Sequence, residues 1–258
     1  MVSPRTGAGG AKGAAVAPAL RRLQMSDDDR RRWKGPGPER QDSGRRSTER
    51  KVIARNARTE SSKRWIERQL QDPYVRKAKD EGYRSRAAYK LLEIDAAAKI
   101  LRKGMRVVDL GCAPGGWIQV SLQQGAAEVV GIDLLPLDPI EGATIIEGDV
   151  NNPDDVARMM AGLSGTPDLI LSDMAANTTG HKQTDHLRTV ALVEMAVAFA
   201  IEHLDDGGAF CAKVFQGGAT KDVLNLLKQH FRTVKHIKPA ASRAGSPEIY
   251  VVAKGFRR

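Results

Sequence analysis

Two aspartates each follow a short apolar segment, and their spacing indicates a nucleoside ligand. Asp133 ends the segment 128–133 and lies 22 residues after Gly111. In open α/β folds, a carboxylate at about this distance from the first glycine turn binds ribose hydroxyl groups. Asp149 follows the next such segment, where its carboxylate could accept a hydrogen bond from an adenine amino group. Either aspartate taken alone is more typical of a cap in a strand-to-helix loop.

The glycine-rich turn at residues 111–116, Gly-Cys-Ala-Pro-Gly-Gly, narrows the class of ligand. Its glycines do not follow the G-x-G-x-x-G spacing, and Pro114 removes one backbone N–H donor. We therefore expect no pyrophosphate here, which argues against a nicotinamide-dependent dehydrogenase. Carboxylates at consecutive strand ends instead favour an adenosine ligand with a positive charge, and S-adenosylmethionine is a sulfonium cation.

A lysine interrupts the otherwise apolar run at residues 209–215. A charged amine is costly to bury, so Lys213 must be paired, neutral, or both. We expect a functional role for it, because a neutral amine in a closed site can act as a general base.

The elements that must position these residues alternate in the manner of a doubly wound α/β domain. Helices are expected at 85–99, 185–203 and 221–230, with an earlier basic helix from residue 61 to the break at Gly82. A short, helix-free connection joins the last two strands, so one strand near the C-terminal edge should be antiparallel. Seven strands are expected, at 106–110, 128–133, 144–147, 168–173, 209–215, 233–237 and 249–254.

The net charge of +10 is concentrated in the first 103 residues. Residues 1–60 carry 15 Lys and Arg against 7 Asp and Glu, and residues 61–103 carry 12 against 6. We expect 1–60 to be a disordered basic arm that contacts RNA phosphates, with 61–103 as a helical RNA-facing part of the domain 61–258. A solubilising tail and an organellar transit peptide are the alternatives for the arm.

Two further features concern the compartment. Cys112 and Cys211 lie far apart in the sequence, which favours a reducing environment over a disulfide framework. The sequence shows neither the roughly 18-residue apolar run of a membrane helix nor an apolar signal-peptide region. The expectation is a soluble intracellular protein.

Six motifs between Tyr83 and Phe256 resemble, in order, those of the FtsJ/RlmE family of ribose 2′-O-methyltransferases. The sequence departs from the family pattern at Ala176, where a proline is common. The motifs are RSRAAYKL (84–91), DLGCAPGGW (109–117), DLLP (133–136), SDM (172–174), KVFQG (213–217), and SR (242–243) followed by EIY (248–250).

The resemblance implies a Rossmann-like class I methyltransferase fold, with a seven-stranded, mostly parallel sheet and helices on both faces. It implies S-adenosyl-L-methionine as cofactor and no metal ion. The catalytic residues implied are Lys90, Asp173, Lys213 and Glu248, and the cofactor residues are Gly115, Trp117, Asp133, Asp149 and Asp173. Within the catalytic set we expect Lys213 to be the base, with Asp173 and Glu248 orienting it.

The activity implied is methylation of a uridine 2′-hydroxyl in large-subunit ribosomal RNA, within the assembled large ribosomal subunit. The enzyme would be a monomer without a membrane partner, in the bacterial cytoplasm or, as a lesser alternative, the mitochondrial matrix. Two alternatives stay open. One is a 2′-O-methyltransferase acting on transfer RNA or an mRNA cap, and the other is a non-catalytic ribosome-assembly factor with the same fold.

Overall fold

The computed structural model describes residues 71–258, except 177–179, 216–220 and 244. The predicted basic arm at 1–60 lies outside the described residues, as does the first part of the helix predicted from residue 61. None of the described helices is both long and apolar enough to cross a membrane.

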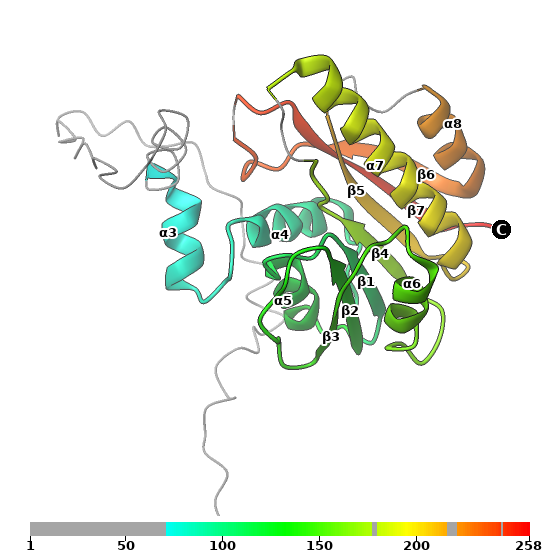
Figure 1. The fold of residues 1–258 in the computed structure, drawn as a ribbon, viewed down its shortest axis with the longest axis horizontal. Coiled ribbons are helices and arrows are strands. Elements are labelled where there is room, and N and C mark those ends of the chain that lie inside the picture. Colours follow the sequence, from blue (N-terminus) through cyan, green and yellow to red (C-terminus); the bar gives the residue numbers. More distant parts are fainter. Residues whose placement is uncertain (1–70, 177–179, 216–220, 244) are drawn as a thin grey trace, which may run out of the picture. The chain divides into compact units, whose positions relative to one another are not determined.

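The described chain forms the predicted seven-stranded sheet (Figure 1). The strand order is β3-β2-β1-β4-β5-β7-β6. The order reverses between β1 and β4, and in folds of this type ligands bind at the carboxyl ends of the strands beside such a switch point. The strands are β1 Arg106–Leu110, β2 Glu128–Asp133, β3 Ala143–Glu147, β4 Leu169–Ser172, β5 Ala209–Phe215, β6 Phe231–Ile237 and β7 Glu248–Phe256.

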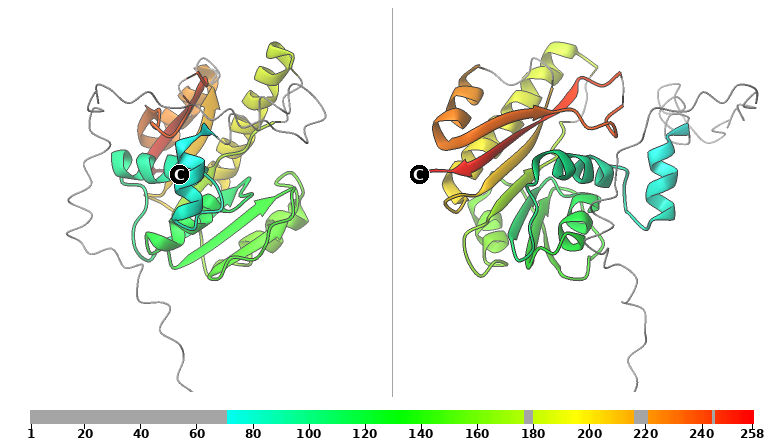
Figure 2. Two further views of the ribbon diagram at one scale, coloured as in Figure 1. Left: turned by 90° about the vertical axis from the view of Figure 1, so that its left-hand side faces the viewer. Right: turned by 180° about the vertical axis from the view of Figure 1, so that it is seen from behind.

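Helices cover both faces of the sheet. The right-hand view in Figure 2, seen from behind, shows the face that carries α4 and α5. Alternate strand residues pack against the two helical layers, as the two-residue period of a strand requires. Helices α4 (Ala87–Ala98) and α5 (Gly116–Gln123) lie on one face. On the other face lie α6 (Pro153–Met160), α7 (Lys182–His203) and α8 (Lys221–His230).

Strand β7 is the predicted antiparallel strand, and it pairs with β5 and with β6. The register places Lys213 opposite Tyr250 and Phe215 opposite Glu248. Because side chains alternate along a strand, Lys213, Tyr250 and Glu248 all point toward the α4 face. The long β5–β7 pairing therefore brings Glu248 and Tyr250, near the C-terminus, close to the residues at the ends of β4 and β5.

Predicted boundaries differ where side chains or long-range pairing set the end of an element. The helix predicted at 85–99 is α4, which ends at Ala98 because Lys99 adopts a left-handed conformation with φ 52°. The Asp95 carboxylate then accepts the N–H groups of Ile100 and Leu101 at 2.9 and 2.7 Å. Strands β6 and β7 are longer than predicted because they pair with each other up to Phe231 and Phe256.

The close packing of α5 on β2 gives a first prediction. A Cβ atom at Gly131 would lie 2.8 Å from both the Cys112 Sγ and the Ile118 Cδ1 atoms. We expect Gly131→Ala to lower the free energy of unfolding by about 1–3 kcal/mol, since the buried neighbours must shift. Urea unfolding would measure this, with Gly245→Ala as control because a Cβ there has open space. Equal stability of the two variants would contradict the packing argument.

Candidate active site

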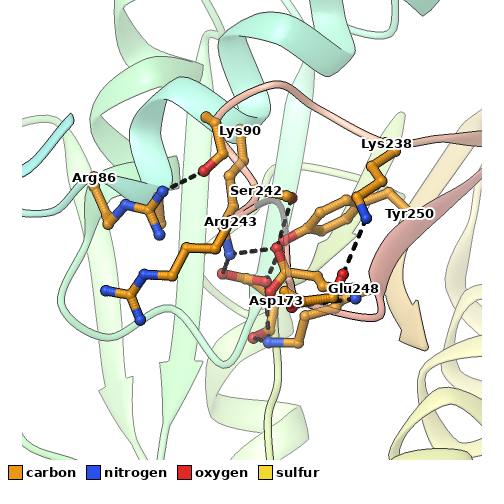
Figure 3. Close-up of polar contacts among 12 residues, drawn as sticks. Arg86, Lys90, Asp173, Lys238, Ser242, Arg243, Glu248 and Tyr250 are labelled. Atoms are coloured by element: carbon orange, nitrogen blue, oxygen red, sulfur yellow. Dashed lines mark hydrogen bonds and ion pairs between the residues drawn. The ribbon is translucent and has the colours of Figure 1, made fainter. Parts of the chain in front are cut away.

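Two lysines and two carboxylates meet on the α4 face of the sheet, beyond the carboxyl end of β4 (Figure 3). Lys213 Nζ lies 3.1 Å from Asp173 Oδ1 and donates to the Asp173 carbonyl oxygen at 2.6 Å. Lys90 Nζ lies 2.8 Å from Glu248 Oε1 and 3.8 Å from Asp173 Oδ2. The structure therefore brings together all four residues that the resemblance implies as catalytic, which are called the tetrad below.

Each of these side chains comes from a different element, so the site exists only in the assembled fold. Lys90 lies on the buried side of α4, and Lys213 lies near the end of β5. Asp173 directly follows β4, while Glu248 is the first residue of β7. Both lysines are only 8% exposed, and burial at that level demands charge partners.

The lysines decide the protonation state of Asp173. Burial alone would raise the pKa of this carboxyl group, but the ion pairs with Lys213 and Lys90 outweigh it, assisted by a hydrogen bond from Tyr250. The pKa of Asp173 is consequently lowered, and the group is a carboxylate at neutral pH.

Two polar residues of the site were not predicted from the sequence. The Tyr250 hydroxyl donates to Asp173 Oδ1 at 2.7 Å, and the Ser242 hydroxyl donates to Glu248 Oε1 at 2.8 Å. Strand periodicity carried a signal for Tyr250, because it lies two residues after Glu248 and so shares its face. Periodicity gave no signal for Ser242, since it belongs to the connection between β6 and β7, and only its place in the SR motif (242–243) marked it.

Arginines form the outer edge of the site. Arg86 Nε lies 3.0 Å and Arg243 Nε 3.5 Å from the buried Asp72 carboxylate, and Arg86 also donates to the Ala241 carbonyl. Figure 3 shows Arg86 and Arg243 beside Lys90 and Asp173. Arg86 and Arg243 line a cavity of about 320 Å³ that reaches Lys90, Asp173 and Glu248. This cavity can admit a polar group carrying negative charge.

On the cofactor side, Asp133 lies at the end of β2, next to the glycine turn. Its Oδ2 accepts the Ala113 N–H at 2.8 Å and its Oδ1 accepts the Leu135 N–H at 2.9 Å. A carboxylate oxygen has two acceptor positions, so each retains capacity for a ligand hydroxyl group. Asp149 lies beyond the end of β3, where its Oδ1 accepts two hydrogen bonds from Asn151 at 2.9 Å.

Gly115 and Trp117 lie at the start of α5 and have different structural roles. Gly115 precedes the helix with φ 104°, a conformation that favours glycine. The Trp117 indole is 2% exposed, and its Nε1–H donates to the Ala87 carbonyl at 2.8 Å. The ring therefore supports the core, and Trp117 would reach a ligand through its backbone.

A third carboxyl group, that of Asp109 in β1, lies beneath the glycine turn. It is 1% exposed, and neither of its oxygens has a hydrogen-bond partner among the residues that the structure describes. Burial raises its pKa well above the ordinary value, and the negative charges of Asp173 and Asp133 add to the effect. The carboxylates of Asp173 and Asp133 create an environment that suits a cationic ligand and disfavours a polyanion, while a protonated Asp109 adds no charge to it.

The sheet order, the glycine turn after β1 and the acidic carboxyl edge define a Rossmann-like methyltransferase. Residues 83–256 match the model of the FtsJ-like methyltransferase family. The chain belongs to this family, and its methyl donor is S-adenosylmethionine. The acidic edge fits the positive charge of this donor, and the free acceptor positions of Asp133 fit its ribose hydroxyl groups.

Relatives extend over most of the chain. Ribosomal RNA large subunit methyltransferase E of Granulibacter bethesdensis is 57% identical over 208 residues, which is 80% of this chain and 90% of the relative. The protein of the same name from Erythrobacter litoralis is 59% identical and covers 80% and 94%. A Plasmodium falciparum crystal structure, assigned as a ribosomal RNA methyltransferase, is 34% identical with a TM-score of 0.61, covering 67% of this chain and 98% of its own.

The buried Asp109 gives a prediction about pH. Its folded-state pKa is raised, so the folded protein keeps a proton that the unfolded chain releases above about pH 4. The contribution of Asp109 to stability is present at low pH and is lost as the pH rises toward the folded-state pKa. Asp109→Asn, which imitates the neutral acid, should therefore gain stability relative to the parent protein as the pH rises.

Urea unfolding at several values between about pH 5 and pH 7 would measure this difference in the absence of the methyl donor. The gain should reach at most about 1.4 kcal/mol per pH unit. A difference that stays constant over this range would show that Asp109 is ionised in the folded protein.

Proposed function

We propose that the chain transfers the methyl group of S-adenosylmethionine to the ribose 2′-hydroxyl of a uridine in large-subunit ribosomal RNA. The observation that carries the proposal is the arrangement of Lys213, whose amine is held by two oxygens of Asp173 beside a cavity lined by arginines. The relatives are named as methyltransferases of large-subunit ribosomal RNA, and these names support this substrate class.

We assign Lys213 the role of general base, and the contacts of its amine support this assignment. An ammonium group has three N–H bonds, and two of them can point to the Asp173 carbonyl and carboxylate oxygens. The neutral amine keeps both bonds and directs its lone pair away from Asp173. A substrate hydroxyl group placed there could transfer its proton to Nζ, and the carboxylate would stabilise the resulting cation.

Lys90 and Glu248 support this centre from the α4 side. Glu248 accepts from Lys90 at 2.8 Å and from Ser242 at 2.8 Å, so its orientation is fixed from two directions. Lys90 then contributes positive charge next to Asp173, at 3.8 Å. We assign Lys90 to binding and orienting the ribose at the cavity. Glu248, which the sequence analysis expected to orient Lys213, contacts Lys90 instead, and we assign it to holding Lys90 in place.

The donor side of the proposal places the ribose of S-adenosylmethionine on Asp133 and its adenine near Asp149. Gly115 and the backbone of Trp117 would border it, and Asp173 would lie between donor and acceptor. When bound, S-adenosylmethionine supplies an electrophilic methyl group on a positively charged sulfur. Its fixed position relative to the ribose oxygen would contribute much of the rate through alignment.

The compartment, the oligomeric state and the assembly state of the substrate are proposals that go beyond the names of the relatives. The relatives are bacterial, so we place the enzyme in the cytoplasm, as a monomer that acts on the assembled large subunit. The names of these relatives lend no support to the mitochondrial alternative. The basic residues 1–60 would add phosphate contacts that strengthen RNA binding without sequence preference. Transfer RNA, an mRNA cap and a non-catalytic assembly role stay as alternatives to be tested.

Replacing the proposed base tests the activity. Lys213→Ala should lower methylation of large ribosomal subunits by at least roughly 100-fold, because proton transfer by a positioned side chain contributes about that much or more. Donor affinity should change by no more than a few fold. The measurement is mapping of 2′-O-methyl groups on ribosomal RNA from cells that lack the chain or carry either version.

Lys235→Ala is a matched control, since Lys235 is an exposed lysine on β6. Full methylation by the Lys213 variant would exclude its role as base. Methylation of transfer RNA or a cap, with ribosomal RNA unchanged, would favour the other RNA substrates. Absence of any methyl transfer by the parent chain would favour the assembly factor.

The donor site gives a separate prediction. Asp133→Ala should weaken binding of S-adenosylmethionine, measured by calorimetry without RNA, by roughly tenfold or more, because two ribose hydroxyl groups lose an ionised acceptor. Asp149→Asn, which keeps an acceptor oxygen, should have a smaller effect. Unchanged donor affinity of the Asp133 variant would refute its assignment to the ribose.

A further inference from the structure

We propose that Arg84 is a positioning residue for the methyl donor, because its guanidinium group fastens the β2–β3 connection, residues 134–142, over the glycine turn. Arg84 belongs to the basic segment that the sequence assigned to RNA. Its contacts in the fold are directed instead to the donor side of the site.

The contacts of the Arg84 guanidinium are specific. Nη1 donates to the Asp138 carbonyl at 2.6 Å and Nη2 donates to the Pro139 carbonyl at 2.7 Å. Two consecutive carbonyl oxygens are thus bound by the planar fork, which the single ammonium group of a lysine cannot reproduce. The side chain is exposed overall, so these bonds restrain a surface segment.

The backbone of Arg84 is fixed just as closely to α5. Its N–H donates to Gln119 Oε1 at 2.8 Å, and Gln119 Nε2 donates to the Gly82 carbonyl at 3.0 Å. Tyr83 adds a hydrogen bond from its hydroxyl to Gln123 Oε1 at 2.6 Å. The arginine is therefore anchored to the helix that begins at the glycine turn, and it can transmit that position to the β2–β3 connection.

The aliphatic part of Arg84 completes the contact. A Cβ atom at Gly115 would lie 3.3 Å from Arg84 Cδ, 3.4 Å from Leu137 Cδ2 and 2.5 Å from Ile140 Cδ1. Gly115 is thus covered by the arginine stem and by two apolar side chains of the segment that the guanidinium holds. Polar and apolar contacts together close this segment against the turn.

The consequence for the donor follows from the position of Asp133. This carboxylate accepts one N–H from the glycine turn, at Ala113, and one from the start of the connection, at Leu135. Its orientation therefore depends on both segments keeping their relative position. Arg84 fixes that relation in the middle of the connection, at Asp138 and Pro139, so its loss should weaken donor binding.

Replacement of the fork tests the inference. Arg84→Gln should raise the dissociation constant for S-adenosylmethionine, measured by calorimetry without RNA, by roughly tenfold, and Arg84→Lys by a smaller factor. Hydrogen exchange of residues 134–142 in the donor-free protein should become faster in both variants, since this segment loses its restraint. Arg76→Gln is the matched control, because it removes the same charge from an exposed arginine on helix α3 (Pro73–Asp80).

The alternative is that Arg84 contacts an RNA phosphate, which predicts a different pattern. Arg84→Gln would then leave donor affinity and hydrogen exchange unchanged, weaken RNA binding and reduce its salt slope by about 1. That result would overturn the inference. Arg84→Lys keeps the charge, so reduced donor affinity in this variant would identify the lost fork, and the melting temperature would show that the variant is folded.

The inference rests on the proposed placement of the donor at Asp133, and the two can fail separately. If Asp133→Ala weakens donor binding while Arg84→Gln does not, the role of Arg84 is wrong and the donor site stands. If Asp133→Ala binds the donor normally, the donor site itself is misplaced. Faster exchange at 134–142 in Arg84→Gln would then confirm the restraint but refute its role in donor binding.

Discussion

An amine in an inner strand of a sheet must keep a negative partner, and for Lys213 that partner is Asp173. The carboxylate and the backbone carbonyl of Asp173 both contact the amine. A charge pair at this depth costs desolvation energy, so losing either member is more harmful than never having had the pair. This constraint explains why the chain ends β4 just before Asp173 and why β7 supplies Tyr250 and Glu248 opposite β5. The proposed catalytic centre and the strand pairing depend on the same contact.

Neighbouring carboxyl groups at the carboxyl edge take opposite protonation states. Asp173 has a lowered pKa because its ion pairs with Lys213 and Lys90 outweigh its burial, while Asp109 has a raised pKa because burial and the charges of Asp173 and Asp133 both act in that direction. The acidic edge can therefore carry negative charge at Asp173 and Asp133 without a third ionised group between them. Such a balance suits a donor that brings one positive charge into the cleft.

The sequence predicted the sheet well because its strands are short apolar runs bounded by turn residues, and five of the seven strand ranges agree at both ends or within one residue. The tetrad was predictable from motif resemblance, and Lys213 also from the cost of burying it. Ser242 and Asp72 could not be predicted, because they act through contacts between distant elements, with Glu248 and with two arginines. The end of α4 depended on the local hydrogen bonds of Asp95, which periodicity does not reveal.

The turn before α4 shows why charge alone does not assign function. Arg84 and Arg86 are separated by one residue in a basic segment, yet their guanidinium groups point to different parts of the site. Arg84 binds carbonyl groups of the β2–β3 connection, on the donor side. Arg86 binds Asp72 and the Ala241 carbonyl, on the side of the cavity that would receive the ribose. Helix α4, which follows this turn, carries Lys90. The orientation of this one helix therefore links the proposed donor site, the proposed acceptor site and the charge on Asp173.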